Sequence, residues 1–166
     1  MAPLLLGGLL TFNDVTIRLT EVEAYLGSDD AASHAFRGPS PRNSAMFGPP
    51  GTWYVYLSYG IHMVGNIVCS PTNVASGVLL RAGSVISGSS LASRRRNFTS
   101  FDNLARGPGN LGQALGLSLA DNGSPVTFEP GKADSVCSGP RVGISKNASA
   151  PLRFWTSGEP SVSRRR

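Results

Sequence analysis

Apolar and polar residues alternate along residues 16–26. Successive side chains of a β-strand point to opposite faces, so this alternation predicts a strand. One face of that strand would carry Ile17, Leu19, Glu21, Glu23 and Tyr25. The pattern by itself predicts an ordinary exposed strand glutamate at Glu21 and favours the same role for Glu23.

Residues 53–69, "WYVYLSYGIHMVGNIVC", are rich in aromatic and β-branched side chains and are interrupted once, at Ser58-Tyr59-Gly60. This pattern predicts a hairpin with strands over residues 53–57 and 61–69 and with Tyr59 at the turn. Tyrosines that alternate along a strand are most often core residues, and we expect that role for Tyr54. A third strand is predicted in "SGVLLRAGSV", which carries Arg81.

The rest of the chain predicts short elements separated by loops. Residues 28–51 contain four prolines and are expected to form a long ordered loop, which in a compact domain is usually functional. "SLASRRRNF" predicts a short helix or an exposed basic loop, and a further helix is expected after an N-cap at Asn110. Asn122-Gly123 predicts a tight turn before a strand in "PVTFEP", and two late strands are expected in "RVGIS" and "LRFWTSG".

Together these elements predict an α+β fold, a curved and mainly antiparallel sheet with a protruding β-hairpin and a few helices. A chain of 166 residues is long enough for one hydrophobic core and too short for two ordinary domains, so residues 1–166 are expected to form a single domain. The 40% apolar and 15% charged content is typical of globular proteins, and 20 glycines with 12 prolines indicate many turns.

The apolar run at residues 2–10 is broken by Pro3, Gly7 and Gly8 and has no basic flank. It is too short to span a bilayer and does not have the form of a signal peptide. We therefore expect a cytoplasmic protein, nucleoid-associated if it is bacterial, with no membrane partner. We also expect a monomer.

Metal-ligating side chains are sparse. The chain has two cysteines, Cys69 and Cys137, which form no C-x-x-C motif, and two histidines, His34 and His62. A structural zinc site would need all four of these residues to converge. We predict no metal and no cofactor.

Positive charge is concentrated in the second half of the chain. Residues 1–93 carry four arginines and five carboxylates, whereas residues 94–166 carry 11 lysines and arginines against five carboxylates. Such a surface attracts phosphate-rich partners through counterion release. Charge alone leaves a second interpretation open, which is general solubility with a basic tail at residues 164–166.

The motifs "EVEAYLG", "SHAFRG", "PRNSAMFGPPGTWYVYLSYGIHMVGN", "GVLLRAG", "RGPGNLGQALG" and "SGPRVGIS" occur in this order between about Thr20 and Ile144. In this order they resemble the alkyladenine (3-methyladenine) DNA glycosylases of the mammalian AAG type. The resemblance implies a monofunctional enzyme that initiates base excision repair. Such an enzyme flips a damaged purine out of double-stranded DNA and hydrolyses its bond to deoxyribose.

The resemblance also implies roles for individual residues. Glu23 matches the general base that activates water, and Arg81 matches the residue that helps to hold this water. The residues that match the walls of the base pocket are Tyr25, His34 and Tyr56. Asn66 matches the side chain that crowds the 2-amino group of normal guanine, and Tyr59 matches the wedge that fills the gap in the duplex. The candidate contacts with the DNA backbone are Arg42, Met46 and Arg141.

This chemistry suits the residue types. A carboxylate can both stabilise the positive charge that develops on the sugar and accept a proton from the attacking water. Aromatic rings bind any purine and favour the cationic ring of 3-methyladenine. Hypoxanthine and ethenoadenine are further candidate substrates, and the preferred lesion stays open.

The main alternative is a nucleic-acid-binding module without catalysis, which would not need Glu23 and Arg81 to converge. A lyase-type glycosylase is disfavoured because the only amine side chains, Lys132 and Lys146, lie outside these motifs.

Overall fold

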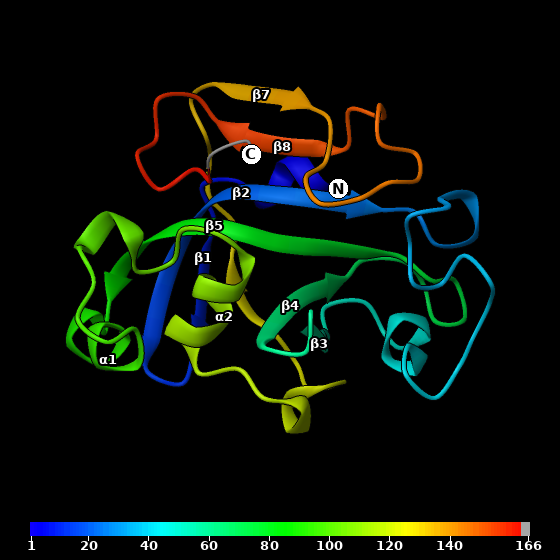
Figure 1. Ribbon diagram of the computed structural model, residues 1–166, viewed down its shortest axis with the longest axis horizontal. Coiled ribbons are helices and arrows are strands. Elements are labelled where there is room, and N and C mark those ends of the chain that lie inside the picture. The colour runs from blue at the N-terminus through cyan, green and yellow to red at the C-terminus, as the bar shows by residue number, and fades with distance from the viewer. Residues whose placement is uncertain (164–166) are drawn as a thin grey trace.

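The computed structural model describes residues 1–163 and has an eight-stranded sheet as its main element (Figure 1). Every strand pair in this sheet is antiparallel. The strands are β1 (Leu9–Phe12), β2 (Val15–Tyr25), β3 (Trp53–Ser58), β4 (His62–Val68), β5 (Gly77–Ser87), β6 (Thr127–Glu129), β7 (Val136–Gly139) and β8 (Arg153–Thr156). The α-helices of the described residues are α1 (Ser89–Arg95) and α2 (Pro108–Leu115), and the short 3-10 helices are η1 (Ala2–Leu5), η2 (Gly27–Asp29), η3 (Ser44–Phe47), η4 (Phe101–Asn103) and η5 (Leu119–Asp121).

The sheet branches at β2. Its strands follow the order β3-β4-β5-β2-β1-β6, while β8 pairs with β2 and carries β7 on its other side. The first part of β2 pairs with β1, and residues Glu21, Val22 and Glu23 pair with β8, so one edge of β2 serves two neighbours in succession. Register shifts between β2 and β5 near Glu21 indicate a β-bulge, a feature that bends and twists a sheet. The resulting curled antiparallel sheet with two helices confirms the predicted α+β fold.

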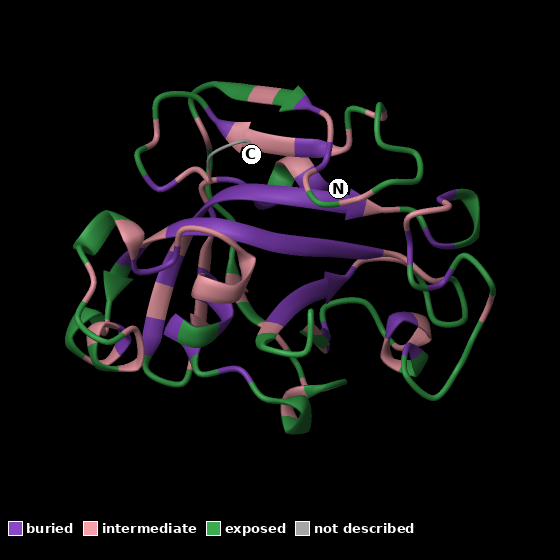
Figure 2. Cartoon of the chain, in the orientation of Figure 1, coloured by how far each residue is buried: buried purple, intermediate pink, exposed green. Residues whose placement is uncertain are grey.

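Strands β2 and β5 are buried almost from end to end (Figure 2). Helix α2 packs against β4 and β5, and η1 packs against β2 and β8, so the centre of the sheet is covered on both sides. Every residue of β2 from Leu19 to Ala24 is therefore buried. The expectation of an exposed glutamate at Glu21 is wrong, because the side chains of Glu21 and Glu23 are both 0% exposed.

The local predictions succeed where the turn chemistry is strong. The hairpin of β3 and β4 forms with its turn at Tyr59-Gly60, the third strand is β5, and the late strand in "LRFWTSG" is β8. The basic segment "SLASRRRNF" forms helix α1. The N-cap prediction is wrong, because α2 begins at Pro108 after Gly107, and the side-chain amide of Asn110 instead donates to the carbonyl oxygen of Arg106.

The strand predicted in "RVGIS" is also wrong. Residues 141–145 form a loop, and the strand of this region lies earlier, at β7. Two features hold the loop: the N–H of Val142 donates to the carboxylate of Glu23, and Gly143 has a φ of +75°, which extended strands do not adopt. No helix within residues 1–163 has both the length and the apolar composition to cross a membrane.

Candidate active site

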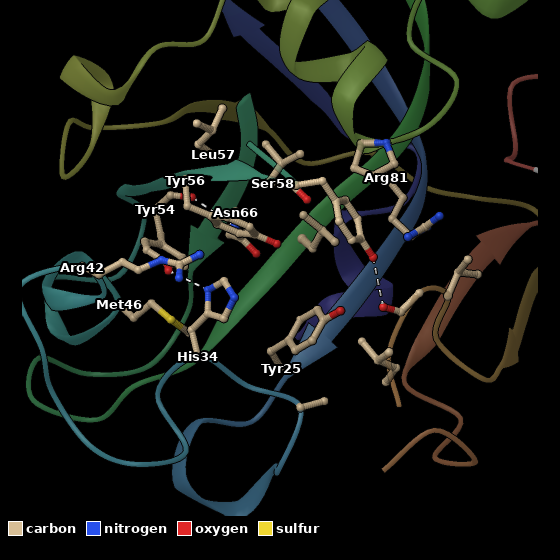
Figure 3. A pocket seen from close by; sticks show the side chains of 18 residues that line it. Tyr25, His34, Arg42, Met46, Tyr54, Tyr56, Leu57, Ser58, Asn66 and Arg81 are labelled. Carbon is tan, nitrogen blue, oxygen red and sulfur yellow. Dashed lines mark hydrogen bonds between the residues drawn. The ribbon is translucent and has the colours of Figure 1, made fainter. Parts of the chain in front are cut away.

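A cavity of about 400 Å³ lies where the β3–β4 hairpin, the β2–β5 pair, the long loop and the loop after β7 meet (Figure 3). Eight of the residues singled out from the sequence line it: Tyr25, His34, Arg42, Met46, Tyr56, Tyr59, Asn66 and Arg81. The structure therefore brings together residues that are up to 56 positions apart in the chain, from Tyr25 to Arg81.

Glu23 lies directly beneath this cavity. Its side chain is 0% exposed, and its three polar neighbours, Tyr25, Arg81 and Val142, all line the cavity. Oε1 accepts a hydrogen bond from the N–H of Val142 at 2.8 Å and lies 3.2 Å from Nη1 of Arg81. Oε2 accepts a hydrogen bond from the hydroxyl of Tyr25 at 3.0 Å. Both carboxylate oxygens are thus held in a fixed orientation behind residues that line the cavity.

Arg81 connects the two buried glutamates of β2. Its Nε donates to Oε1 of Glu21 at 2.8 Å, its Nη1 faces Glu23, and its Nη2 donates to Oγ of Ser163 at 3.2 Å. Arg153 donates from Nε to the same oxygen of Glu21 at 2.6 Å. We call the four side chains of Glu21, Glu23, Arg81 and Arg153 the ionic floor.

Tyr25 stands between the ionic floor and the cavity. Burial and the neighbouring Glu23 carboxylate raise the pKa of Tyr25 well above its usual value, so its hydroxyl stays protonated and donates to Glu23 at neutral pH. The guanidinium of Arg141 lies 4.5 Å from the centre of the Tyr25 ring in a cation-π contact. Arg141 therefore fixes the ring from behind the cavity lining.

Arg141 is itself locked in place. Its side chain is fully buried, donates to the carbonyl oxygen of Ala24 at 2.9 Å, and forms a two-armed ion pair with Asp30. Burial alone would raise the pKa of Asp30, but hydrogen bonds from Arg141, Asn147 and the N–H of Ala32 outweigh it and lower the pKa to about 2. The expected contact of Arg141 with the DNA backbone is corrected by this burial, because the fully buried guanidinium has no surface with which to meet a phosphate.

Three rings form the opposite side of the cavity, which we call the aromatic wall: His34, Tyr54 and Tyr56. The His34 and Tyr56 rings meet edge to face at 4.5 Å, and Tyr54 lies 5.5 Å from Tyr56. The hydroxyl of Tyr54 lies 2.8 Å from Nδ1 of His34. In Figure 3 these side chains gather across the cavity from Tyr25 and Arg81.

The protonation states of the aromatic wall follow from its burial. Burial, and then the charge of Arg42, lower the pKa of His34, so its ring is neutral at pH 7. Burial, and then Tyr56, raise the pKa of Tyr54 to about 12, so Tyr54 keeps its proton. In the tautomer in which Tyr54 donates to Nδ1 of His34, the ring proton lies on Nε2.

The remaining predicted residues occupy different depths. Asn66 is 4% exposed, and its amide donates to the carbonyl oxygen of Tyr54 at 3.1 Å. Tyr59 is 83% exposed at the tip of the hairpin, in the left-handed region with a φ of +50°. Arg42 is exposed at the cavity, as a DNA contact requires. Met46 is 2% exposed and packs into a small apolar cluster, so the expectation of a DNA backbone contact is corrected for its side chain.

The described residues contain no cluster of three or more histidine, cysteine, aspartate or glutamate side chains that could hold a metal ion. The two buried glutamates are instead neutralised by arginines. The polar groups that line the cavity include the guanidinium groups of Arg42 and Arg81, tyrosine hydroxyls and the neutral imidazole of His34, and the oriented carboxylate of Glu23 is buried beneath them.

The family model for methylpurine-DNA glycosylase (MPG) matches residues 1–160. The chain belongs to this family. A protein of Corynebacterium efficiens named "Putative 3-methyladenine DNA glycosylase" is 57% identical over 172 residues, which cover 100% of this chain and 90% of the relative. Proteins with the same name from Corynebacterium glutamicum strain ATCC 13032 and Cutibacterium acnes are 55% and 52% identical and cover 100% and 98% of this chain and 92% and 93% of their own lengths.

Membership of the methylpurine-DNA glycosylase family confirms the resemblance found in the sequence motifs. It supports DNA glycosylase function, and with it DNA as the substrate.

For this family member, the structure adds two residues that the sequence did not place at the site. Tyr54 lines the cavity rather than only the core, and Glu21 belongs to the ionic floor. The available signal was the same for both, because Tyr54 has the period-two spacing with Tyr56 that Glu21 has with Glu23.

Proposed function

We propose that this chain is a monofunctional DNA N-glycosylase that hydrolyses the bond between a damaged purine and deoxyribose with a water molecule activated by Glu23. The observation that carries the proposal is the position of Glu23, a fully buried carboxylate in contact with three groups that line a cavity. The proposed substrates are 3-methyladenine and, at lower rates, hypoxanthine or ethenoadenine.

The hydrogen bonds of Glu23 leave it able to act as a base. A carboxylate offers about four acceptor positions, and two of those of Glu23 are used by hydrogen bonds from Val142 and Tyr25. A water molecule can occupy a remaining position and transfer its proton as its oxygen bonds to the sugar carbon and the purine leaves. The negative charge of the carboxylate also favours the positive charge that develops on the sugar.

The aromatic wall suits a flat, electron-poor ligand. Rings on two sides of the cavity, with Tyr25 across from His34 and Tyr56, can stack on a purine and attract a cationic one. The lowered pKa of His34 matters here, because a neutral imidazole does not repel the positive charge of 3-methyladenine. A proton on Nε2 makes His34 a candidate donor to a neutral purine that needs help to leave.

The hairpin provides access to the duplex. A tyrosine that is 83% exposed at a hairpin tip beside the cavity is placed to enter the base stack. Side chains that insert in this way offset the few kcal/mol that are needed to unstack and extrude a base. We assign this role to Tyr59.

A binding module without catalysis explains the floor less well. Burying carboxylates and guanidinium groups carries a desolvation cost of several kcal/mol per ion that only well-formed partners offset. Groove binding requires exposed cations and rings, and it gives no reason for an oriented carboxylate beneath the cavity.

A lyase mechanism needs an amine nucleophile. The two lysines, Lys132 and Lys146, are both exposed and absent from the cavity lining.

A base-release assay tests the proposal. Purified protein is incubated with duplexes that each contain one lesion, in the presence of EDTA, and the free base and the strand are both followed. We expect free purine without EDTA-dependent loss of rate, and strands that break only after alkali treatment. Absence of released base across the panel would refute the glycosylase assignment, loss of activity with EDTA would refute the metal-free mechanism, and strand breaks without alkali would indicate a lyase.

A further inference from the structure

Glu21 precedes Glu23 by two residues on β2 and is equally buried, at 0% exposure. Its Oε1 accepts hydrogen bonds from Nε of Arg81 at 2.8 Å, Nε of Arg153 at 2.6 Å and Oγ of Ser163 at 2.9 Å. Its Oε2 accepts from the N–H of Ser163 at 2.6 Å. Neither glutamate is itself part of the cavity lining, but Glu23 contacts the lining residues Tyr25 and Val142, whereas Glu21 forms no hydrogen bond with either of them.

We propose that Glu21 is a positioning residue that sets the orientation of Arg81 and so keeps Glu23 available to water. The inference rests on the proposed function, because it concerns the same carboxylate and the same hydrolysis. It assigns Glu21 no contact with the substrate.

The guanidinium of Arg81 is shared between Glu21, Ser163 and Glu23. Arginine and a carboxylate tend to pair through two parallel hydrogen bonds, which would occupy both oxygens of one partner. In this structure Nε and Nη2 of Arg81 are bound by Glu21 and Ser163, and only Nη1 is directed at Glu23. The distance from Nη1 to Glu23, 3.2 Å, is longer than the 2.8 Å from Nε to Glu21.

Removal of Glu21 would free Nε of Arg81. The guanidinium could then turn to pair with Glu23 through two arms, and the acceptor position that a water molecule needs would be lost. Binding of the flipped purine depends on the aromatic wall and is not expected to change. A positioning role for Glu21 therefore predicts slower chemistry without weaker binding.

Arg153 and Ser163 make the arrangement of Glu21 rigid. Nη2 of Arg153 donates to the carbonyl oxygen of Ser163 at 3.0 Å, and its guanidinium lies 4.8 Å from the ring of Trp155. The two glutamates and two arginines of the ionic floor carry balanced charge, which a buried cluster requires. Residues 161–163 thus fasten β2, β5 and β8 together just below the reacting groups.

A double-mutant cycle tests this role. We would compare the wild-type protein with Glu21→Gln, Arg81→Met and the double variant, and measure the single-turnover rate of base release and the dissociation constant for the lesion duplex. Glu21→Gln is expected to lower the rate about tenfold, with a dissociation constant within about threefold of wild type. In the Arg81→Met background the same change is expected to lower the rate by less than about twofold, because the group through which Glu21 acts is absent.

Two controls accompany the cycle. Glu129→Gln makes the same replacement at an exposed strand position in β6 and is expected to leave both quantities unchanged. Ser163→Ala removes one partner of Glu21 and Arg81 at a half-buried site and is expected to slow release about threefold at unchanged affinity. This variant decides the question if Glu21→Gln does not fold.

A wild-type release rate in folded Glu21→Gln would overturn the inference. An equal loss of rate in the presence and absence of Arg81 would also overturn it, since Glu21 would then act by another route. If Glu21→Gln is unfolded, a wild-type rate in Ser163→Ala has the same meaning. A wild-type rate in Glu23→Gln would show that the proposed function is wrong, and the inference about Glu21 would fall with it.

Discussion

The two sides of the cavity are built on different physical principles. The ionic floor consists of buried charges on β2, β5 and β8 that are held by ion pairs and hydrogen bonds. The aromatic wall consists of rings from the long loop and β3 that are held by the edge-to-face contacts of His34, a tilted contact between the two tyrosines and one hydrogen bond. Charges in a protein interior need fixed partners, whereas rings tolerate many flat ligands.

The two sides of the cavity are therefore suited to different functions. Under the proposed function, the ionic floor carries out the hydrolysis and the aromatic wall selects the base. Substitutions in the floor should then alter the rate of the chemical step, and substitutions in the wall should alter which lesion is removed.

The Glu23→Gln variant removes the proposed base from the floor and keeps its shape. We expect base release to fall at least about a hundredfold, the usual contribution of general base catalysis, while binding to a lesion duplex persists. The measurement is single-turnover release beside a gel-shift titration, with Glu129→Gln as the control. A Glu23→Gln rate near wild type would remove Glu23 from the mechanism.

Acid should weaken the ion pair of Asp30 with Arg141, the residue that supports the Tyr25 ring beside the ionic floor. The pKa of Asp30 is lowered to about 2 by Arg141, Asn147 and Ala32, so ionised Asp30 stabilises the fold above pH 4 by about 2 kcal/mol. This contribution disappears as the pH falls from about 4 to 2. Urea unfolding at pH 5 and at pH 2.5 should show a smaller loss for Asp30→Asn than for wild type, and equal losses would contradict the assignment.

Tyr59→Ala removes the proposed wedge from the hairpin tip. We expect about tenfold slower release from a paired lesion, because the variant no longer offsets the few kcal/mol of unstacking. The same lesion in single-stranded DNA needs little unstacking and serves as the internal control. An unchanged rate on the duplex would count against the wedge.

Tyr54→Phe removes the hydroxyl that orients His34 in the aromatic wall. Release of hypoxanthine, a neutral base, should fall about threefold, in line with the loss of one hydrogen bond, while release of cationic 3-methyladenine stays unchanged. The ratio of the two rates is the measurement. Equal changes for both bases would show that His34 does not assist the neutral leaving group.

The sequence predicts the hairpin and the third strand because their signals are local. Aromatic and β-branched residues on either side of Tyr59-Gly60 determine β3 and β4 without reference to the rest of the chain. The motifs of the resemblance place Glu23, Tyr25 and Arg81 together, and the structure brings these three into contact.

The errors arise where tertiary contacts override the local pattern. Alternation on β2 predicts an exposed Glu21, but η1 and α2 pack against the sheet, β8 pairs with β2 along its edge, and two arginines distant in sequence neutralise the charge. From the sequence alone, Arg141 is expected to be an exposed DNA contact. In the structure, Asp30 and Tyr25 pack against its guanidinium. Partners separated by more than a hundred residues, as Arg141 and Asp30 are, leave no periodic signal.

The most direct test of the account is a crystal structure of the Glu23→Gln variant bound to a duplex that contains one ethenoadenine. The account predicts a purine rotated out of the duplex and stacked against Tyr25 and Tyr56, with Tyr59 in the gap that the base leaves and residue 23 facing the sugar. A lesion that remains stacked in the duplex, or that binds away from this cavity, would contradict it.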